Sequence, residues 1–487
     1  MKAKFALALL AVPLAPVLAR ATPRPFALRR SIADVPDLTC TSTDRWPVGL
    51  GKAYITQEPD DELREILAEV DPARIEAIIE NLVSFGTRHT MSSQDDPERG
   101  IGAARDWIAA EMRSFAEASE GRMTVETPSF IQPPNGDRID RDTNITNIVA
   151  ILKGDTDPDR AYLVSGHYDS RNSDPMDFEG EAPGADDDAS GVAVSMELAR
   201  IMSTRRTAAT LMFVAVAGEE QGLLGATNLA DQLTSENSTY DLQGMFTNDI
   251  IGSPKADDGT VDPYSIRLFG QGVNPNDTET AQASRLILGG ENDTPPRQLA
   301  RFVREVASND ATNMTVNVIY RIDRFLRGGD HRPFLERGIA AARFTEPHED
   351  YAHQHQDVRL EDGQQYGDLL EFCDFDFISR VARVSGAALW SLANAPGTPK
   401  NVTIDASVLG NNSTLGWTLD DAAESYEVVW RATNAPFWSN VIDVGKTDTT
   451  TIRQSKDNAV FGVRAVGANG YRSPAEYPKA INCNRYC

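Results

Sequence analysis

Histidine and carboxylate residues gather in short clusters that could bind metal ions. The first cluster contains His167 and Asp169 and directly follows an apolar segment. An imidazole binds zinc through one ring nitrogen, and a nearby carboxylate can accept a hydrogen bond from the other nitrogen. Taken alone, this motif favours a structural histidine held by hydrogen bonds, so the interpretation of His167 as a ligand depends on the other clusters.

Three consecutive aspartates, Asp186 to Asp188, form the second cluster. Adjacent carboxylates repel one another unless they are solvated or bound to a cation. They could lie in an exposed loop in which Asp188 caps the helix that follows. The flanking glycine and alanine residues favour close packing instead, and a carboxylate at this place could bridge two metal ions.

Two further clusters place carboxylates against apolar segments. Glu219 and Glu220 follow the apolar run 210–217, and Asp249 stands inside the apolar segment 245–252. One glutamate could bind a metal ion while the other accepts a proton from an activated water. A solvated turn would also accommodate either glutamate singly. An unpaired charge in an apolar strand is costly, and metal binding would remove that cost for Asp249.

Histidines are concentrated late in the chain. The sequence contains six, and four of them lie in or near a loop that follows a predicted strand at 341–344. Random placement would rarely give this distribution, so these residues are candidates to complete a metal site. They are His331, His348, His353 and His355.

The segments around these clusters alternate between strand and helix patterns. This alternation predicts an α/β fold with a mixed central sheet flanked by helices. In such sheets ligands bind beyond the carboxyl ends of strands, where the clusters stand. Strands are expected at 145–152, 161–165, 210–217 and 245–252, and helices at 75–82, 101–115, 189–202, 222–233 and 366–394.

The C-terminal region differs in character from this α/β region. Residues 395–399 have the composition of a linker, and short β-rich runs separated by turns follow. They predict a small all-β sandwich at 396–487. The expected organisation is a signal peptide at 1–21, a pro-segment or N-terminal strap at 22–60, a catalytic domain at 61–395 and the β-sandwich.

The first residues have the pattern of a signal peptide. Lys2 and Lys4 precede an apolar run at 5–18, which is too short to span a bilayer, and a small-x-small cleavage pattern ends at Ala21. A buried N-terminal helix is the alternative. No later segment has the hydrophobicity of a membrane anchor, so we expect a secreted protein.

Charge and cysteine content limit the other functions. The formal net charge of -25 disfavours binding to nucleic acid or to an anionic membrane surface, although it also serves solubility. Four cysteines in a secreted chain suggest two disulfides with three possible pairings. A small loop between Cys483 and Cys487 would leave Cys40 for Cys373.

The clusters, in order, resemble a known enzyme family. The motifs HYDS, PGADDDASG, EEQGLLG and NDIIG and a late H-x-x-x-D are similar to those of the two-zinc exopeptidases. That family includes bacterial leucyl aminopeptidases, glutamate carboxypeptidases and glutaminyl cyclases. The resemblance covers roughly 75–395. More loosely, the C-terminal region resembles a fibronectin type III module, which says little about function.

The resemblance implies two zinc ions and assigns their ligands. His167 and Asp249 would bind one ion, and Asp187 would bridge to the other. Glu219 would be the general base, and Asp169 would orient His167. The complete implied set of ligands is His167, Asp187, Glu220, Asp249 and His353.

The sequence offers two candidates for the last ligand. The family places it four residues before an aspartate, which selects His353 ahead of Asp357. The usual surroundings are altered here to Ala-His-Gln-His, so His355 remains an alternative. His331, in GGDHRPF, is expected near the site, and Tyr320 could donate a hydrogen bond to the oxyanion.

The implied activity is that of a secreted aminopeptidase that acts on peptides with a free N-terminus. The alternatives are a carboxypeptidase or a glutaminyl cyclase of the same family, or a non-catalytic binding protein. Complete sets of ligands and base argue against a binding protein. The cyclases resemble the rest of the family but use a single zinc ion. Nothing in this sequence removes the second zinc site, which weakens the cyclase interpretation.

Overall fold

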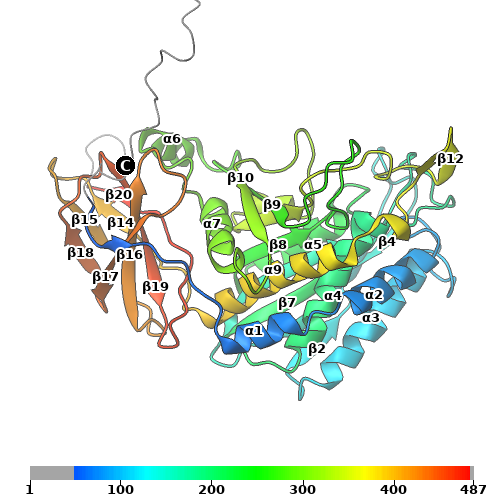
Figure 1. The fold of residues 1–487 in the computed structure, drawn as a ribbon, viewed down its shortest axis with the longest axis horizontal. Coiled ribbons are helices and arrows are strands. Elements are labelled where there is room, and N and C mark those ends of the chain that lie inside the picture. Colours follow the sequence, from blue (N-terminus) through cyan, green and yellow to red (C-terminus); the bar gives the residue numbers. More distant parts are fainter. Residues whose placement is uncertain (1–48, 483–487) are drawn as a thin grey trace, which may run out of the picture. The chain divides into compact units, whose positions relative to one another are not determined.

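An eight-stranded mixed sheet forms the centre of the fold in the computed structural model, which describes residues 49–482 (Figure 1). Its central strands β11, β8, β6 and β7 run parallel, so their carboxyl ends meet at one edge. In spatial order the strands are β10 (Thr315–Ile319), β9 (Ser265–Gly270), β11 (Ala341–Thr345), β8 (Asp241–Asn248), β6 (Asp157–His167), β7 (Ala209–Val216), β5 (Ile148–Leu152) and β2 (Met123–Glu126).

Helices cover both faces of this sheet, as the alternating strand and helix patterns predict. One face packs against α1 (Asp61–Ala68), α2 (Pro72–Ser84), α3 (Ile101–Glu117), α4 (Ser190–Met202), α7 (Pro295–Ala307) and α9 (Phe375–Asn394). The other face packs against α5 (Leu224–Thr234) and α8 (His331–Glu336). The predicted α/β class with a mixed central sheet flanked by helices is therefore confirmed.

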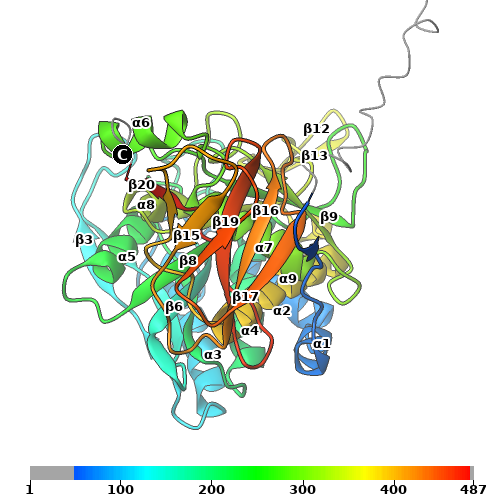
Figure 2. The ribbon, with the colours of Figure 1, turned by 90° about the vertical axis from the view of Figure 1, so that its left-hand side faces the viewer.

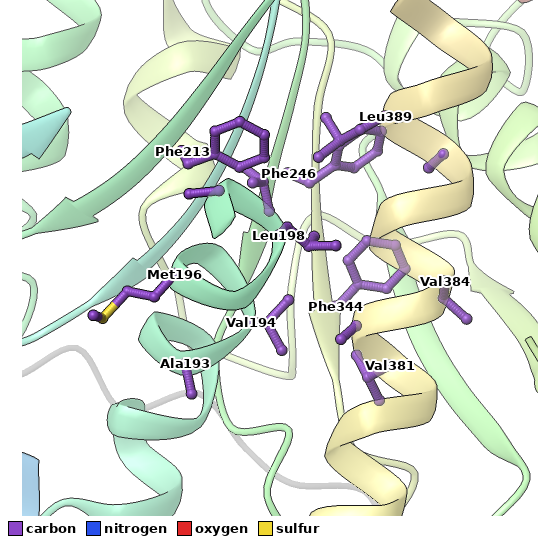
Figure 3. Close-up of a cluster of buried hydrophobic side chains, with 14 of the residues drawn as sticks. Ala193, Val194, Met196, Leu198, Phe213, Phe246, Phe344, Val381, Val384 and Leu389 are labelled. Carbon is purple, nitrogen blue, oxygen red and sulfur yellow. The ribbon is translucent and has the colours of Figure 1, made fainter. Parts of the chain in front are cut away.

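Strand β7 shows why the sheet needs both layers. Every residue of β7 is buried, as the uninterrupted apolar run predicts. Because side chains alternate across a strand, Phe213 faces the cluster that contains α4 and α9, while Met212 and Val214 face the cluster that contains α5 and α8. In Figure 3, Phe246 and Phe344 lie between α4 and α9, and Phe213 lies on the strand above α4.

Several predicted elements have different ends in the structure; the strand expected at 245–252, for example, is β8, so Asp249 follows the strand instead of standing inside it. Two elements differ more. The strand expected at 145–152 is interrupted at Asn147 into β4 (Thr143–Thr146), which pairs with β3 (Ser129–Gln132), and β5. The Asn147 amide donates to the carbonyl oxygen of Gly225 and its oxygen accepts from the backbone nitrogen of Ala217, so tertiary hydrogen bonds outweigh the apolar pattern.

The helix expected at 366–394 begins only at Phe375. The side chain of Asp374 caps α9 by accepting from the backbone nitrogen of Phe377. The residues before it form β13 (Gln364–Tyr366), which pairs with β12 (Arg359–Glu361). A polar capping residue therefore decides where the helix begins.

The C-terminal part contains two four-stranded sheets with a shared apolar core. One sheet has the order β1 (Lys52–Ala53), β17 (Asn440–Gly445), β16 (Ser425–Ala432) and β19 (Ala459–Val466). The other has the order β18 (Thr449–Ile452), β15 (Ser413–Gly416), β14 (Thr403–Asp405) and β20 (Lys479–Ile481). Strand β1 precedes the α/β part in the sequence, yet Figure 2 shows it beside β17 of this sheet.

Several predictions fall outside the described residues. They are the signal peptide at 1–21, residues 22–48 of the pro-segment or strap, and the cysteines Cys40, Cys483 and Cys487. Both disulfides therefore stay predictions. Among residues 49–482, none of the helices combines the length and hydrophobicity that a membrane-spanning segment requires.

Candidate metal centre

The candidate ligands converge at the carboxyl ends of the four central strands. His167 is the last residue of β6, Glu220 lies in the turn after β7, and Asp249 directly follows β8. Asp187 lies in the turn before α4, and His355 lies in the loop after β11. Parallel strands of a sheet all present these ends at the same edge, which brings together residues that are distant in sequence.

A first group of ligand atoms comes from His167, Asp187 and Asp249. The Nε2 atom of His167 lies 3.1 Å from Oδ1 of Asp187 and 3.8 Å from Oδ1 of Asp249. All three side chains are buried. One imidazole nitrogen and two carboxylate oxygens thus face a common point, which is a donor set that zinc accepts.

A second group shares Asp187 with the first. The Nε2 atom of His355 lies 2.8 Å from Oδ2 of Asp187 and 2.9 Å from Oε1 of Glu220. The two carboxylate oxygens of Asp187 therefore serve different groups, one each. This is the arrangement expected of a carboxylate that bridges two metal ions.

His353 does not belong to either group, which corrects the predicted last ligand. Its ring stacks on Phe372, with the ring centroids 3.6 Å apart, and its Nδ1 lies 3.7 Å from Asp350. His355 stands in the predicted place instead, with a backbone φ of 53° that turns the chain there. The aspartate used to select His353, Asp357, accepts hydrogen bonds from Ser173.

The three aspartates of the triplet have separate roles. Asp187 faces the two groups, whereas Asp188 accepts hydrogen bonds from the backbone nitrogens of His167 and Gly191. Asp188 thereby joins the end of β6 to the first turn of α4. Asp186 accepts from the backbone nitrogen of Gly252, after β8. The sequence indicated the bridging role of Asp187, through the family resemblance, and a helix cap at Asp188, but it gave no role to Asp186.

Close packing of two glycines supports this junction. A Cβ atom added to Gly166 would lie 2.3 Å from the carbonyl carbon of Gly191, and one added to Gly191 would lie 2.1 Å from the carbonyl oxygen of Asn248. A larger residue at either position would push α4 away from β6 and β8. The glycines thus allow Asp187, before α4, to approach His167.

A residue that sequence reasoning missed holds Asp187 in place. The carboxylate of Asp368 accepts hydrogen bonds from the backbone nitrogens of Asp186 and Asp187, each at 2.8 Å. Burial is the largest cause that raises the pKa of Asp368, to about 7. No signal in the sequence identifies this residue, because it lies far along the chain from the turn that it supports.

Asp169 orients His167 through its backbone and not chiefly through its side chain. The Nδ1 atom of His167 lies 3.0 Å from the carbonyl oxygen of Asp169 and 3.7 Å from its carboxylate. The carboxylate instead accepts from the backbone nitrogens of Glu219 and Glu220 and from the hydroxyl of Thr90. Asp169 therefore positions His167 through its carbonyl oxygen, and Glu219 and Glu220 through its carboxylate.

Two arginines bind the candidate ligands. The buried Arg343 forms an ion pair of 2.7 Å with Asp249, and Arg171 forms one of 2.7 Å with Glu220. These pairs hold the carboxylates in fixed orientations, as hydrogen-bonding partners of metal ligands commonly do. Neither arginine was identified from the sequence, because nothing local to either residue indicates the contact.

The charges of the second group influence one another strongly. Burial lowers the pKa of His355, but the charges of Glu220 and Asp187 outweigh it and raise the pKa to about 9. Burial raises the pKa of Glu220, but His355 is the main cause that brings it down to about 2. Both shifts show that this place favours a positive charge.

Glu219 presents a carboxylate without a bonding partner to a cavity of about 680 Å³. No other described residue forms a hydrogen bond or an ion pair with its side chain, while its backbone nitrogen donates to Asp169. Burial is the largest cause that raises its pKa well above the ordinary value; His167 opposes this, and the charges of Glu220 and Asp249 add to it. A carboxylate with a raised pKa suits a general base.

Comparison with known proteins identifies the enzyme class. Residues 147–361 match the model of peptidase family M28. A protein of Phaeosphaeria nodorum called "Probable zinc metalloprotease" is 51% identical, over 92% of this chain and 93% of its own. One of the same name from Pyricularia oryzae is 52% identical, over 94% of this chain and 93% of its own. The chain belongs to peptidase family M28. It is a zinc metalloprotease.

The matched M28 segment contains every member of both ligand groups as well as Glu219. Among solved structures, the aminopeptidase from Aneurinibacillus sp. strain AM-1 is 17% identical to this M28 protein. That similarity covers 68% of this chain and 96% of the other, with a TM-score of 0.46.

The geometry of the M28 site fits zinc. Tetrahedral ligands about 2.0 Å from zinc lie about 3.3 Å from one another, and the separations within the two groups are between 2.8 and 3.8 Å. The buried Oε1 of Glu220 accepts no hydrogen bond from a described residue, although His355 lies nearby. Such short separations between ligand atoms that form no hydrogen bond with each other are expected where the atoms bind the same cation.

Two other residues singled out in the sequence of the M28 protein have surroundings that differ from each other. His331 lies beside the site, with its Nε2 3.9 Å from Asp323. Asp323 pairs with Arg343, the partner of Asp249. His331 is fully buried, and its Nε2 contacts the carbonyl oxygen of Ile322, so it supports the loop before α8. The hydroxyl of Tyr320 donates to the carbonyl oxygen of Pro436 in the C-terminal part. Tyr320 therefore does not provide the predicted oxyanion contact.

Proposed function

We propose that this M28 protein is an aminopeptidase that hydrolyses peptides with a free N-terminus and uses two zinc ions. The observation that carries the proposal is the sharing of Asp187 between two complete ligand groups beside Glu219. His167 and Asp249 would hold one ion, and Glu220 and His355 the other.

The residues of the chain have distinct tasks in this reaction. When bound, zinc supplies the Lewis acidity that lowers the pKa of water and polarises the scissile carbonyl group. Glu219 accepts the proton of the attacking water and passes it to the leaving nitrogen. Asp169 keeps Glu219 in place through the backbone nitrogen, and Arg343 keeps Asp249 directed at the site.

The completeness of both groups supports hydrolysis over cyclisation. A glutaminyl cyclase of this family would use a single zinc, whereas Asp249 and His167 retain a full set of donors for a second ion. A non-catalytic binding protein would have no need of Glu219. A carboxypeptidase shares the same chemistry, so the end of the peptide that is cleaved has to be measured.

Secretion is part of the proposal and rests on the N-terminal pattern of a signal peptide. Expression of the full chain in a secreting host tests it. Recovery of the protein from the medium with an N-terminus beyond residue 21 supports secretion, and retention of the uncleaved chain inside the cell contradicts it.

Mass spectrometry of incubated peptides tests the activity. The set contains a peptide with a free amino terminus, its acetylated twin and a peptide that begins with glutamine. Stepwise loss from the free N-terminus with the acetylated twin intact is the expected result. Loss from the C-terminus would show a carboxypeptidase, and loss of ammonia from the glutamine peptide would show a cyclase. No change in any peptide, with zinc bound, would overturn the proposal.

A further inference from the structure

The cavity beside Glu219 is unusually rich in arginine for so acidic a chain. The whole sequence has 47 lysines and arginines against 72 aspartates and glutamates. The cavity, however, has equal numbers of arginines and carboxylates in its lining. The five arginines are Arg138, Arg171, Arg324, Arg327 and Arg332.

Three of these arginines already have acidic partners. Arg171 pairs with Glu220, and Arg324 pairs with Glu349 at 3.1 Å. Arg332 lies 3.7 Å from Glu336, one turn later on α8. Their charges are at least partly compensated within the protein.

Arg138 and Arg327 have no such compensation. Arg138, between β3 and β4, donates to the carbonyl oxygen of Glu220 at 2.7 Å. Arg327, between β10 and α8, donates to the side-chain oxygen of Gln354 at 3.3 Å. Neither forms an ion pair with a carboxylate among residues 49–482, and both are only partly buried. Each guanidinium group therefore retains donors that can face a substrate.

Metal binding would leave these two charges in excess. Four of the five carboxylates in the cavity are Glu219 and the candidate ligands, and the fifth is the exposed Asp137. They balance the arginines only while no cation is bound. With divalent cations in both groups the cavity becomes positive, and a positive cavity attracts anionic substrates.

We propose that Arg138 and Arg327 bind a carboxylate of the substrate close to the scissile bond, so that the enzyme prefers acidic peptides. This inference rests on the proposed function and names its substrate class. A guanidinium group is suited to the role because its planar donors match the two oxygens of a carboxylate. The carboxylate could belong to an acidic side chain or to the C-terminus of a short peptide.

Three dipeptide substrates test the preference for acidic peptides and show which carboxylate causes it. Leu-Gln amide is neutral beyond its amino terminus, Leu-Glu amide adds a side-chain carboxylate, and Leu-Gln with a free C-terminus adds a terminal carboxylate. We expect kcat/KM to be about tenfold higher for at least one anionic peptide than for the amide of Leu-Gln, because hydrogen bonds between a guanidinium group and a carboxylate are charge-assisted. The advantage should appear mainly in KM and should decrease in high salt.

Single substitutions assign the preference to residues. Arg138→Gln and Arg327→Gln keep a polar side chain and remove the charge, and each should lower the ratio of anionic to neutral kcat/KM by about three- to tenfold. Arg321→Gln is the matched control, because Arg321 is exposed and belongs to the same loop as Arg327 but does not line the cavity. That variant should keep the ratio of the unchanged enzyme.

The outcomes separate this inference from the proposed function. Hydrolysis of all three peptides with equal kcat/KM would overturn the inference and leave the aminopeptidase proposal intact. A preference that survives in the double variant Arg138→Gln, Arg327→Gln would also overturn it. If no peptide is hydrolysed, calorimetric binding of the same three peptides to the zinc-loaded Glu219→Gln protein decides the inference. Tighter binding of an anionic peptide supports it, and equal binding overturns it.

Discussion

Arg431 Nη2 lies 2.6 Å from Oδ2 of Asp293, and both side chains are buried. Asp293 precedes α7 of the α/β part, whereas Arg431 belongs to β16 of the C-terminal part. Asp293 also pairs with Arg301 of α7 at 3.0 Å. One carboxylate thus pairs with two buried guanidinium groups and joins the two parts of the chain.

Asp293→Ala should destabilise the protein strongly, because it leaves two buried arginines without a counter-charge. Breaking a buried pair by removing one partner costs about 3–5 kcal/mol. For a unit of this size that corresponds to a decrease in Tm of roughly 3–5 °C, which differential scanning calorimetry can measure. Asp310→Ala is the control, because it removes an exposed ion pair with Arg64 and should change Tm little. A similar decrease in both variants would contradict the role of Asp293.

His355→Ala and His353→Ala should behave differently. The first removes a candidate ligand, so about one zinc per chain should be lost and kcat/KM should fall more than about 100-fold, as expected for several kcal/mol of lost stabilisation. The second removes only a ring stacked on Phe372. Zinc content after dialysis, measured by plasma mass spectrometry, distinguishes them. Loss of zinc from the His353 variant alone would reverse the assignment.

Glu219→Gln should abolish most turnover while both metal groups stay filled. The substitution keeps the shape of the side chain but removes the base, and a general base contributes about 10²- to 10⁴-fold. Steady-state kinetics and zinc content are measured on the same preparation. Glu236→Gln changes an exposed glutamate after α5 and serves as the control. Retention of more than a tenth of the activity in Glu219→Gln would rule out the base assignment, by the same estimate.

Glu476 predicts a pH-dependent stability of the C-terminal part. Burial is the largest cause that raises its pKa to about 7 from an ordinary 4.5, and Arg285 opposes it. The folded state then binds a proton more tightly than the unfolded state. The protonated carboxyl group of Glu476 therefore favours the folded state. This contribution to stability is complete below about pH 4.5 and is lost as the pH rises through about 7.

Glu476→Gln should therefore increase stability at pH 8 by about 1–3 kcal/mol and leave it unchanged near pH 4. Thermal unfolding of both proteins between pH 4 and 8 checks the direction. Glu424→Gln, at an exposed glutamate of the same part, is the control. A variant that is less stable than the parent at pH 8 would disprove the burial argument.

Much of the site was predictable because its ligands follow apolar strands. His167 ends a strand, Asp249 directly follows one and Glu220 lies in the turn after one. The sequence pattern reveals these strands, and parallel strands bring their ends together. The choice between His353 and His355 was not predictable in this way. It depends on a backbone turn at His355 inside an irregular loop, and the family spacing pointed to the other histidine.

The supporting residues were not predictable for a different reason. Arg343 and Asp368 act on residues far from them in sequence, and neither carries a local pattern. The same holds for strand β1, whose two residues have no apolar alternation and are recognised only by their pairing with β17. Local periodicity therefore reveals the main elements of the fold but not the contacts that join them.

Strand β1 restricts where a maturation protease could cut the chain without loss. Beyond its pairing with β17, the same segment contains Tyr54, whose hydroxyl bonds to Glu305 and Arg464, and Asp60, which caps α1 and accepts from Tyr471. Cleavage near residue 60 would produce a peptide that stays bound by these contacts. The mature enzyme would then be a nicked two-chain protein whose shorter chain is held by strand pairing and hydrogen bonds.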